Sequence, residues 1–365
     1  MKERIVGIDF LKILSMLMVV LLHVLSQGGI MSNTVPFSCK YYLSNFMEIS
    51  SYCAVNCYAL ISGYTLFKPK VNYSGIINLW FEVLFYNLLI TAIFCIFMPQ
   101  VIVPRHFILM LGPVSFGNYW YFSAYFAMYF FIPAMNFVIE HMGKADVGKM
   151  VMAIFLVLSF LPWASEKGLF AMNNGYSTIW LMALYLVGAY IKKYDIGKEI
   201  KLIWPIAGYF LCVIIVAAYK FAASYQNFSR TGELLDGRLW LNYTSPFILF
   251  AAVFLLLICL KIDIQADCVK KIIATCSVSS FSVYLLHTHS LIWEHVFPDS
   301  FASIDKLPTL YFVPLILLSC VGIYAVSVPI DLVRIKLFKL LTINKLAIFL
   351  DEKWSSWFNR IFSKV

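Results

Sequence analysis

The chain alternates long apolar runs with short clusters of charged and turn-forming residues. A helix that crosses the hydrocarbon core of a bilayer needs about 20 mostly apolar residues. Runs of this kind lie near residues 5–25, 46–66, 77–98, 118–138, 149–163, 177–191, 202–222, 243–260, 275–294 and 309–333. The fifth and sixth runs are short, which favours helices that are tilted or partly buried in protein. The pattern predicts an all-α polytopic membrane protein with about ten transmembrane helices.

The residues after the last run predict a helix of a different kind. Apolar side chains recur there at helical spacing, and basic side chains lie off this stripe. The stripe consists of Trp354, Trp357, Phe358 and Ile361. Such a helix lies in the plane of the membrane surface, and a frayed basic tail is the alternative. We therefore predict a transmembrane domain over residues 1–335 and a cytoplasmic amphipathic tail over residues 336–365.

The composition supports the membrane prediction and excludes other classes. Of the 365 residues, 62% are hydrophobic and 13% are charged, and the mean hydropathy is +0.83. This balance excludes a water-soluble globular enzyme. The net charge is +9, and the loops on the side of the N-terminus hold 20 Lys and Arg residues against 6 on the other side. Because such an excess marks cytoplasmic loops, we expect both termini in the cytoplasm and no binding to nucleic acid.

The nine cysteines do not indicate a disulfide framework. Their number is odd, and most of them lie inside apolar runs, where a thiol behaves as a small hydrophobe. Cys53 and Cys57 are one helical turn apart, but no His or Cys pair nearby completes a tetrahedral set of ligands. We therefore expect no metal.

The first span carries three ionisable side chains, which are functional candidates because polar groups at membrane depth are costly. Lys12 and His23 are 11 residues apart, so their side chains project from one face of a helix, about 16 Å apart along its axis. Asp9 lies one turn before Lys12, where its carboxylate can hold the ammonium group. The alternative is that Asp9 and Lys12 neutralise each other near the interface and that His23 is an interfacial histidine.

The sequence around these residues resembles a known family. The segment RIVGIDFLKILSMLMVVLLHV, with ten residues between Lys12 and His23, resembles the opening helix of the acyltransferase-3 family of membrane acyltransferases. Further resemblances follow in the family's order at residues 61–64 (ISGY), 118–123 (NYWYFS) with Pro133, 183–190, and 282–287 (SVYLLH). The resemblance covers nearly the whole chain. It implies a bacterial plasma-membrane enzyme that transfers an acyl group, usually acetyl from coenzyme A, to a hydroxyl of an envelope glycan such as a polysaccharide.

Acyl transfer to an alcohol needs a base that takes the hydroxyl proton, and a neutral imidazole suits this role near neutral pH. His23 is the candidate base, and the resemblance implies that its counterpart is the family's essential histidine. Glu48, near the outer start of the second span, is the candidate that orients the imidazole. A carboxylate without a partner at headgroup level is the alternative for Glu48. Direct transfer and an acyl-histidine intermediate both stay open.

The resemblance implies acetyl-CoA as the acyl donor. Coenzyme A is cytoplasmic and anionic, so we expect its phosphates at the lysine-rich inner side. The candidate donor-binding residues are Asp9, Lys12, Lys68 and Lys70. The family often has closely spaced arginines at the entry to its third helix, whereas residues 71–82 of this chain contain no arginine. Lys68 and Lys70 supply positive charge there, but lysine lacks the planar fork that suits phosphate. Glu82, near the inner start of the third span, either pairs with Lys12 or caps a helix end.

The candidate acceptor-binding residues lie near the outer ends of the spans. They are Trp120, Tyr121, His287 and His289. The aromatic rings can stack on a sugar or frame the thioester, although aromatic belts at membrane interfaces are the commoner reason for such residues. The two histidines fall at a depth similar to that of His23, and they either line the same cavity or bond to neighbouring helices.

A membrane transporter is the alternative function. In that case Asp9, Lys12, His23 and Glu48 line a substrate path rather than a reaction centre. Broken helices in matching halves favour transport, and the sequence shows no such internal symmetry. The expected partners are therefore an acyl-CoA donor, a glycan acceptor and the lipid bilayer.

Overall fold

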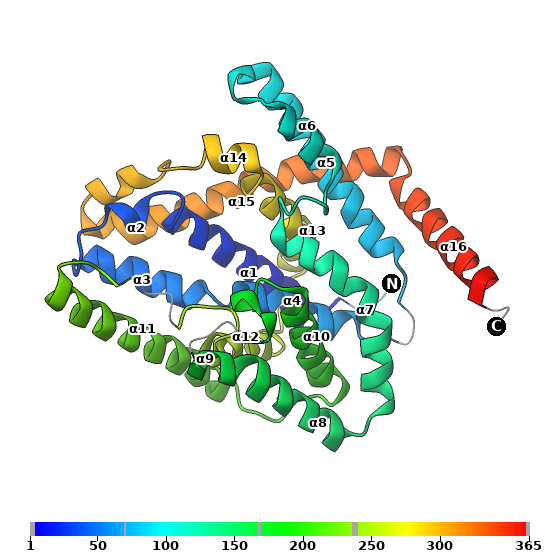
Figure 1. Ribbon diagram of the computed structural model, residues 1–365, viewed down its shortest axis with the longest axis horizontal. Helices are drawn as coiled ribbons and strands as arrows, with labels where there is room; N and C mark the ends of the chain where they lie inside the picture. Colours follow the sequence, from blue (N-terminus) through cyan, green and yellow to red (C-terminus); the bar gives the residue numbers. More distant parts are fainter. Residues whose placement is uncertain (1–3, 69–70, 166–168, 236–239, 363–365) are drawn as a thin grey trace.

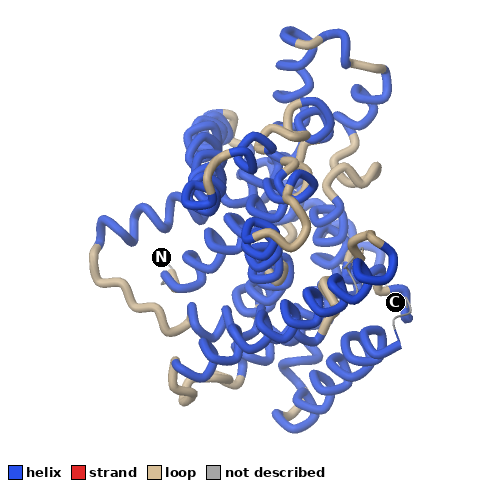
Figure 2. Tube along the Cα trace, turned by 90° about the vertical axis from the view of Figure 1, so that its left-hand side faces the viewer, coloured by secondary structure: helices blue, strands red, loops and turns tan. Residues whose placement is uncertain are grey.

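The computed structural model describes residues 4–68, 71–165, 169–235 and 240–362, which form helices joined by loops and contain no strand (Figure 1; Figure 2). The α-helices are α1 Val6–Leu25, α2 Ile30–Asn33, α3 Cys39–Ser51, α4 Ala54–Leu66, α5 Ser74–Phe97, α6 Pro104–Leu111, α7 Trp120–His141, α8 Lys144–Ala153, α9 Leu161–Ser165, α10 Thr178–Lys193, α11 Ile203–Thr231, α12 Pro246–Cys259, α13 Asp267–His287, α14 Ser290–His295, α15 Thr309–Leu340 and α16 Ile343–Phe362. A π-helical segment, Ile154–Phe160, joins α8 to α9. Short 3₁₀ turns lie at Pro99–Val101, Leu169–Ala171, Asn173–Gly175 and Ala302–Lys306.

Seven stretches of the described chain are long and apolar enough to cross a membrane. They are Val6–Asn33, Ser74–Phe97, Trp120–His141, Lys144–Ser165, Ile203–Thr231, Asp267–His287 and Thr309–Leu340. The predicted all-α membrane fold is therefore confirmed, whereas the count of ten spans is not. The three other predicted spans fall on shorter helices. One is divided between α3 and α4, and the other two correspond to α10 and α12, which have 16 and 14 residues.

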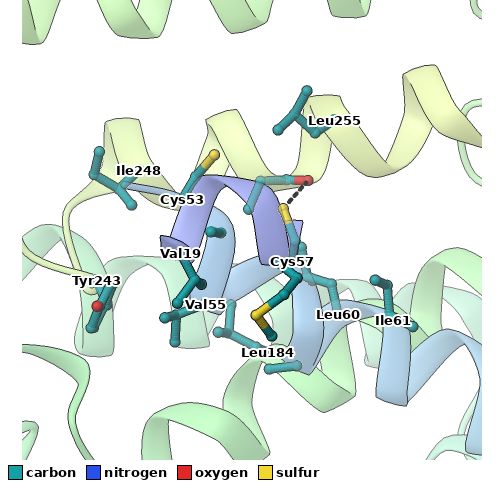
Figure 3. Packing of buried hydrophobic residues seen from close by; sticks show 14 of the residues in the cluster. Val19, Cys53, Val55, Cys57, Leu60, Ile61, Leu184, Tyr243, Ile248 and Leu255 are labelled. Atoms are coloured by element: carbon teal, nitrogen blue, oxygen red, sulfur yellow. Dashed lines mark hydrogen bonds between the residues drawn. The ribbon is translucent and has the colours of Figure 1, made fainter. Parts of the chain in front are cut away.

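Helices α1, α4, α10 and α12 pack closely in the hydrophobic core. A Cβ atom at Gly63 would overlap the carbonyl group of Tyr185, and one at Gly188 would overlap that of Leu60, so α4 and α10 approach each other through glycine from both sides. Small residues permit this approach of two backbones in membrane bundles. Figure 3 shows apolar side chains of these four helices meeting around Cys57, whose thiol points to a carbonyl group of α12. The cysteine therefore packs as a small hydrophobe, as the sequence predicts.

The C-terminal helix α16 packs against α5, on the side of the molecule where α1 begins (Figure 1). Asp351 of α16 accepts a hydrogen bond from the backbone N–H of Ser74 at 3.1 Å and so caps the first turn of α5. Trp354 and Trp357 are about half exposed, at 49% and 53%. The predicted amphipathic helix is thus present, but α15 continues to Leu340, past the domain boundary predicted after residue 335.

Candidate active site

A cavity of about 310 Å³ lies between α1, α4, α5, α7 and α13. Lys12 and His23 both line it, and Met16, Val19 and Leu22 line it between them. The two ionisable side chains therefore share one face of α1, as their spacing predicts. The same cavity is thus lined by the cation of Lys12, in the first half of α1, and by the imidazole of His23, near the end of that helix.

At the end of this cavity that lies nearer the start of α1, Asp9 is surrounded by three donors. Its Oδ2 lies 2.8 Å from Nε of Arg4, and its Oδ1 lies 3.5 Å from Nζ of Lys12. The Ser277 hydroxyl of α13 donates to Oδ1 at 2.8 Å. The predicted pairing of Asp9 with Lys12 is confirmed, and Arg4 is a partner that the sequence analysis missed. Two cations on one carboxylate leave this end of the cavity with a net positive charge.

At the other end of α1, His23 contacts a second histidine. Its Nδ1 lies 2.9 Å from Nε2 of His287, the last residue of α13. Nδ1 of His287 lies 2.5 Å from the backbone oxygen of Val283, one turn earlier in the same helix. The indole ring of Trp293 packs edge-on against His23, with 4.9 Å between ring centroids. The imidazole of His23 is thus held from two sides.

These hydrogen bonds determine which nitrogen of His23 carries a proton when both rings are neutral. A backbone carbonyl only accepts, so Nδ1 of His287 must donate to Val283. Nε2 of His287 is then an acceptor, and Nδ1 of His23 must donate to it. Nε2 of His23 is left with its lone pair. This is the tautomer that a general base needs.

The structure does not pair Glu48 with His23. The carboxylate of Glu48 in α3 forms an ion pair with Nζ of Lys220 in α11 at 2.7 Å. The partner that orients His23 is therefore His287 rather than Glu48. Glu48 lies at a suitable depth, but its side chain faces α11, and depth alone does not determine the direction in which a side chain points.

The aromatic candidates lie in the wall of the cavity, whereas the histidine candidates lie behind it. Trp120 and Tyr121 begin α7 and line the cavity. Trp120 stacks with Tyr243, at 5.9 Å between ring centroids. The described cavity wall includes neither His287 nor His289. Nδ1 of His289 accepts a hydrogen bond from the backbone of α14, so this residue caps that short helix.

The lysine candidates between α4 and α5 are only partly described. Lys68 lines a second cavity of about 310 Å³, together with Asn72, Ser74 and Tyr129. Leu66, at the end of α4, lines both cavities and marks where they adjoin. Lys70 lies outside the described residues.

A buried polar network that the sequence analysis missed joins α5, α13 and α15. Arg334 lies 3.4 Å from Glu82 and 2.6 Å from Asp331, and the Ser282 hydroxyl donates to both carboxylates. Tyr86 donates to Asp331 at 2.9 Å. Glu82 therefore pairs with Arg334 rather than Lys12, and it caps no helix because α5 begins earlier, at Ser74. Asp331 and Arg334 are three residues apart in α15, and this spacing is the signal in the sequence that could have predicted their ion pair.

The described residues contain no group of three or more His, Cys, Asp and Glu side chains placed to hold a metal ion. A family model described as an acyltransferase domain matches residues 5–328, which include every helix that lines the main cavity. Comparisons with curated proteins and with solved structures found no match. The family match, the multi-pass helical fold and the cavity that Lys12 and His23 both line agree: the chain belongs to the acyltransferase-3 family and carries its acyltransferase domain.

Proposed function

We propose that this membrane acyltransferase moves an acetyl or other short acyl group from cytoplasmic acyl-CoA to a hydroxyl of an extracytoplasmic polysaccharide or related envelope glycan. The observation that carries the proposal is the single cavity that Lys12 and His23 line from two depths of α1. The excess of basic residues in the loops on the side of the N-terminus supports a cytoplasmic position for Lys12. His23 then faces the acceptor side.

His23 acts as the general base in this proposal. Its Nε2 takes the proton of the acceptor hydroxyl as the hydroxyl oxygen attacks the thioester carbon. His287 orients the base: its Nε2 lies 2.9 Å from Nδ1 of His23. It can accept the Nδ1–H hydrogen bond of the neutral imidazole and of the imidazolium that forms. The same Nε2 of His23 can return the proton to the departing thiolate.

Two features support the binding of coenzyme A: the positive charge near Lys12 and the distance between Lys12 and His23. Arg4 and Lys12 share Asp9, so cationic groups are available at the inner end for the phosphates of coenzyme A. Lys68 lines the adjoining cavity and adds a further cation. The distance of about 16 Å between the levels of Lys12 and His23 suits the flexible thiol-bearing arm of coenzyme A. The apolar side chains between the two residues suit the uncharged part of that arm.

Aromatic groups support the acceptor side of the proposal. Trp120, Tyr121 and Tyr243 line the cavity together with His23. Aromatic rings of this kind offer flat apolar faces to the C–H groups of a sugar. Acylation of a glycan hydroxyl next to His23 is therefore compatible with the lining of the cavity.

Acyl transfer is tested with the purified protein in lipid nanodiscs, acetyl-CoA labelled in the acetyl group, and surface polysaccharide from cells that lack the protein. We expect label in the polysaccharide with the wild type and none with His23→Ala. His141→Ala is the matched control, because this histidine is exposed at the other end of α7. Equal transfer by the wild type and His23→Ala would show that His23 is not the general base. Unchanged glycan acylation in cells without the protein, together with loss of solute uptake, would favour a transporter.

A further inference from the structure

The hydroxyl group of Tyr121 is buried and has no hydrogen-bond partner among the described residues. Its side chain lines the cavity that contains His23. A buried hydroxyl without a partner costs free energy, so native proteins rarely keep one that no bound group uses. This residue therefore needs an explanation that the fold alone does not supply.

Four other hydroxyl groups of the cavity wall are already engaged. The Tyr58 hydroxyl donates to the backbone oxygen of Lys12 at 2.6 Å, and Ser62 and Thr65 donate to carbonyl groups of their own helix at 2.9 and 2.8 Å. Ser277 donates to Asp9. Tyr121 differs from these residues because no described group accepts a hydrogen bond from its hydroxyl.

Neighbouring rings hold the phenol of Tyr121 in place. It stacks with Tyr125 at 6.1 Å between centroids, and it meets Trp120 and Tyr58 edge-on at 5.6 and 6.3 Å. A donor that is fixed before the reaction needs no reorganisation when charge develops near it. Such preorganised donors stabilise the oxyanion of acyl transfer.

We infer that Tyr121 is a catalytic residue whose hydroxyl donates a hydrogen bond to the thioester oxygen as it becomes an oxyanion, an inference that rests on the proposed function. The acceptor oxygen forms its bond to the carbonyl carbon while its proton passes to Nε2 of His23. The π electron pair of the carbonyl moves to the oxygen, where the Tyr121 hydroxyl binds it. When the carbon–sulfur bond breaks, the pair returns to the carbonyl and the thiolate takes the proton from His23.

Tyr121→Phe tests this inference because it removes one oxygen atom and keeps the ring. We expect kcat to fall about 100-fold, the loss typical of one oxyanion donor, with both KM values within about twofold of the wild type. Because the deleted hydroxyl has no protein partner, the midpoint of thermal unfolding stays the same or rises. Lower activity together with unchanged or higher stability is the signature of a catalytic group.

Tyr209→Phe is the matched control. Its phenol is buried in α11 and donates to the backbone oxygen of Ser50 at 2.7 Å, away from the cavity. We expect this variant to unfold at a lower temperature and to keep the kcat of the wild type. A loss of stability in Tyr121→Phe as large as that in Tyr209→Phe would mean that the Tyr121 hydroxyl has a structural partner, which would overturn the inference.

The same assay includes the wild type and His23→Ala. If the wild type transfers acyl groups in a His23-dependent way and Tyr121→Phe keeps full kcat, the inference is wrong and the proposed function stands. If Tyr121→Phe raises only the KM of the acceptor, the hydroxyl binds substrate rather than the oxyanion, and the inference is again wrong. If the wild type transfers no acyl group, the proposed function fails and the role of Tyr121 fails with it.

Discussion

Nδ1 of His23 lies 2.9 Å from Nε2 of His287, and the two residues are 264 positions apart in the chain. The last residue of α13 thereby orients the base carried by α1. The direction of this hydrogen bond follows from a third group, the carbonyl of Val283, which fixes the tautomer of His287. The base thus depends on a backbone group that it does not touch.

This dependence predicts the effect of substitutions at His287. We expect His287→Leu to lower kcat about 100-fold, at the lower end of what a positioned base contributes. His287→Gln keeps an acceptor oxygen for Nδ1–H of His23 and is expected to lose less. Steady-state kinetics and the pH profile of kcat/KM measure both effects, because the pH profile reports the essential base. Equal kinetics for the Gln and Leu variants would show that His287 only fills space.

The charge at the inner end of the cavity predicts a donor-specific effect of Lys12. Lys12→Ala removes one charge-assisted contact, worth about 1.5 kcal/mol, which corresponds to about a tenfold rise in the KM for acetyl-CoA. The KM for the acceptor should not change, and Lys12→Arg should have a smaller effect because it keeps the cation. Lys149→Ala is the control, since Lys149 pairs with Asp146 on the exposed surface of α8. A normal KM for acetyl-CoA in Lys12→Ala would contradict the donor role.

The ion pair between Glu48 and Lys220 predicts a loss of stability rather than a direct catalytic effect. Glu48→Gln leaves the largely buried ammonium of Lys220 without its carboxylate, at a cost of about 1–3 kcal/mol. We expect a lower midpoint of thermal unfolding and an unchanged kcat per folded molecule. The double variant Glu48→Gln and Lys220→Met should recover part of the lost stability, because no uncompensated charge is left. A lower kcat without a loss of stability would contradict this prediction and would show that Glu48 contributes to the reaction.

Two native cysteines provide a test of orientation. Cys39, at the start of α3, and Cys268, at the start of α13, are both exposed, and the distribution of basic residues assigns them to opposite sides of the membrane. We expect a membrane-impermeant maleimide to label Cys39 in intact cells and Cys268 only after permeabilisation. Cys39→Ser and Cys268→Ser identify the labelled sites. The reverse pattern would exchange the roles of the two ends of α1, and labelling of both in intact cells would mean that the number of crossings between them is even.

The relation of Lys12 to His23 was predictable because it depends on one continuous helix. Eleven residues of α1 set both the common face and the separation, whatever the other helices do. The pairing of Asp9 with Lys12 was predictable for the same reason, since the two residues are one turn apart in that helix. The periodicity of one helix was therefore enough to predict how Asp9, Lys12 and His23 are placed relative to one another.

The partners of His23 and Glu48 were not predictable in this way. Each partner comes from another helix, and depth in the membrane leaves the rotation of that helix about its axis undetermined. For His287 the sequence left two alternatives, and the structure shows the second: its side chain is not part of the cavity wall and bonds to His23 of a neighbouring helix. Glu48 was expected near His23 but faces Lys220, which is 172 residues away in the chain. These directions depend on how the helices pack against one another, which local periodicity does not determine.

The apolar stretch between Lys12 and His23 also bears on the membrane's electrical insulation. A water-filled path from one side of a bilayer to the other would conduct protons and dissipate the gradient on which the cell depends. Met16, Val19 and Leu22 give the cavity apolar side chains at the levels between its two ionisable residues, and apolar lining of a narrow passage opposes a continuous file of water. We therefore expect liposomes that contain the protein to hold a proton gradient as well as protein-free liposomes do. A passage suited to a flexible organic chain can in this way stay closed to ions.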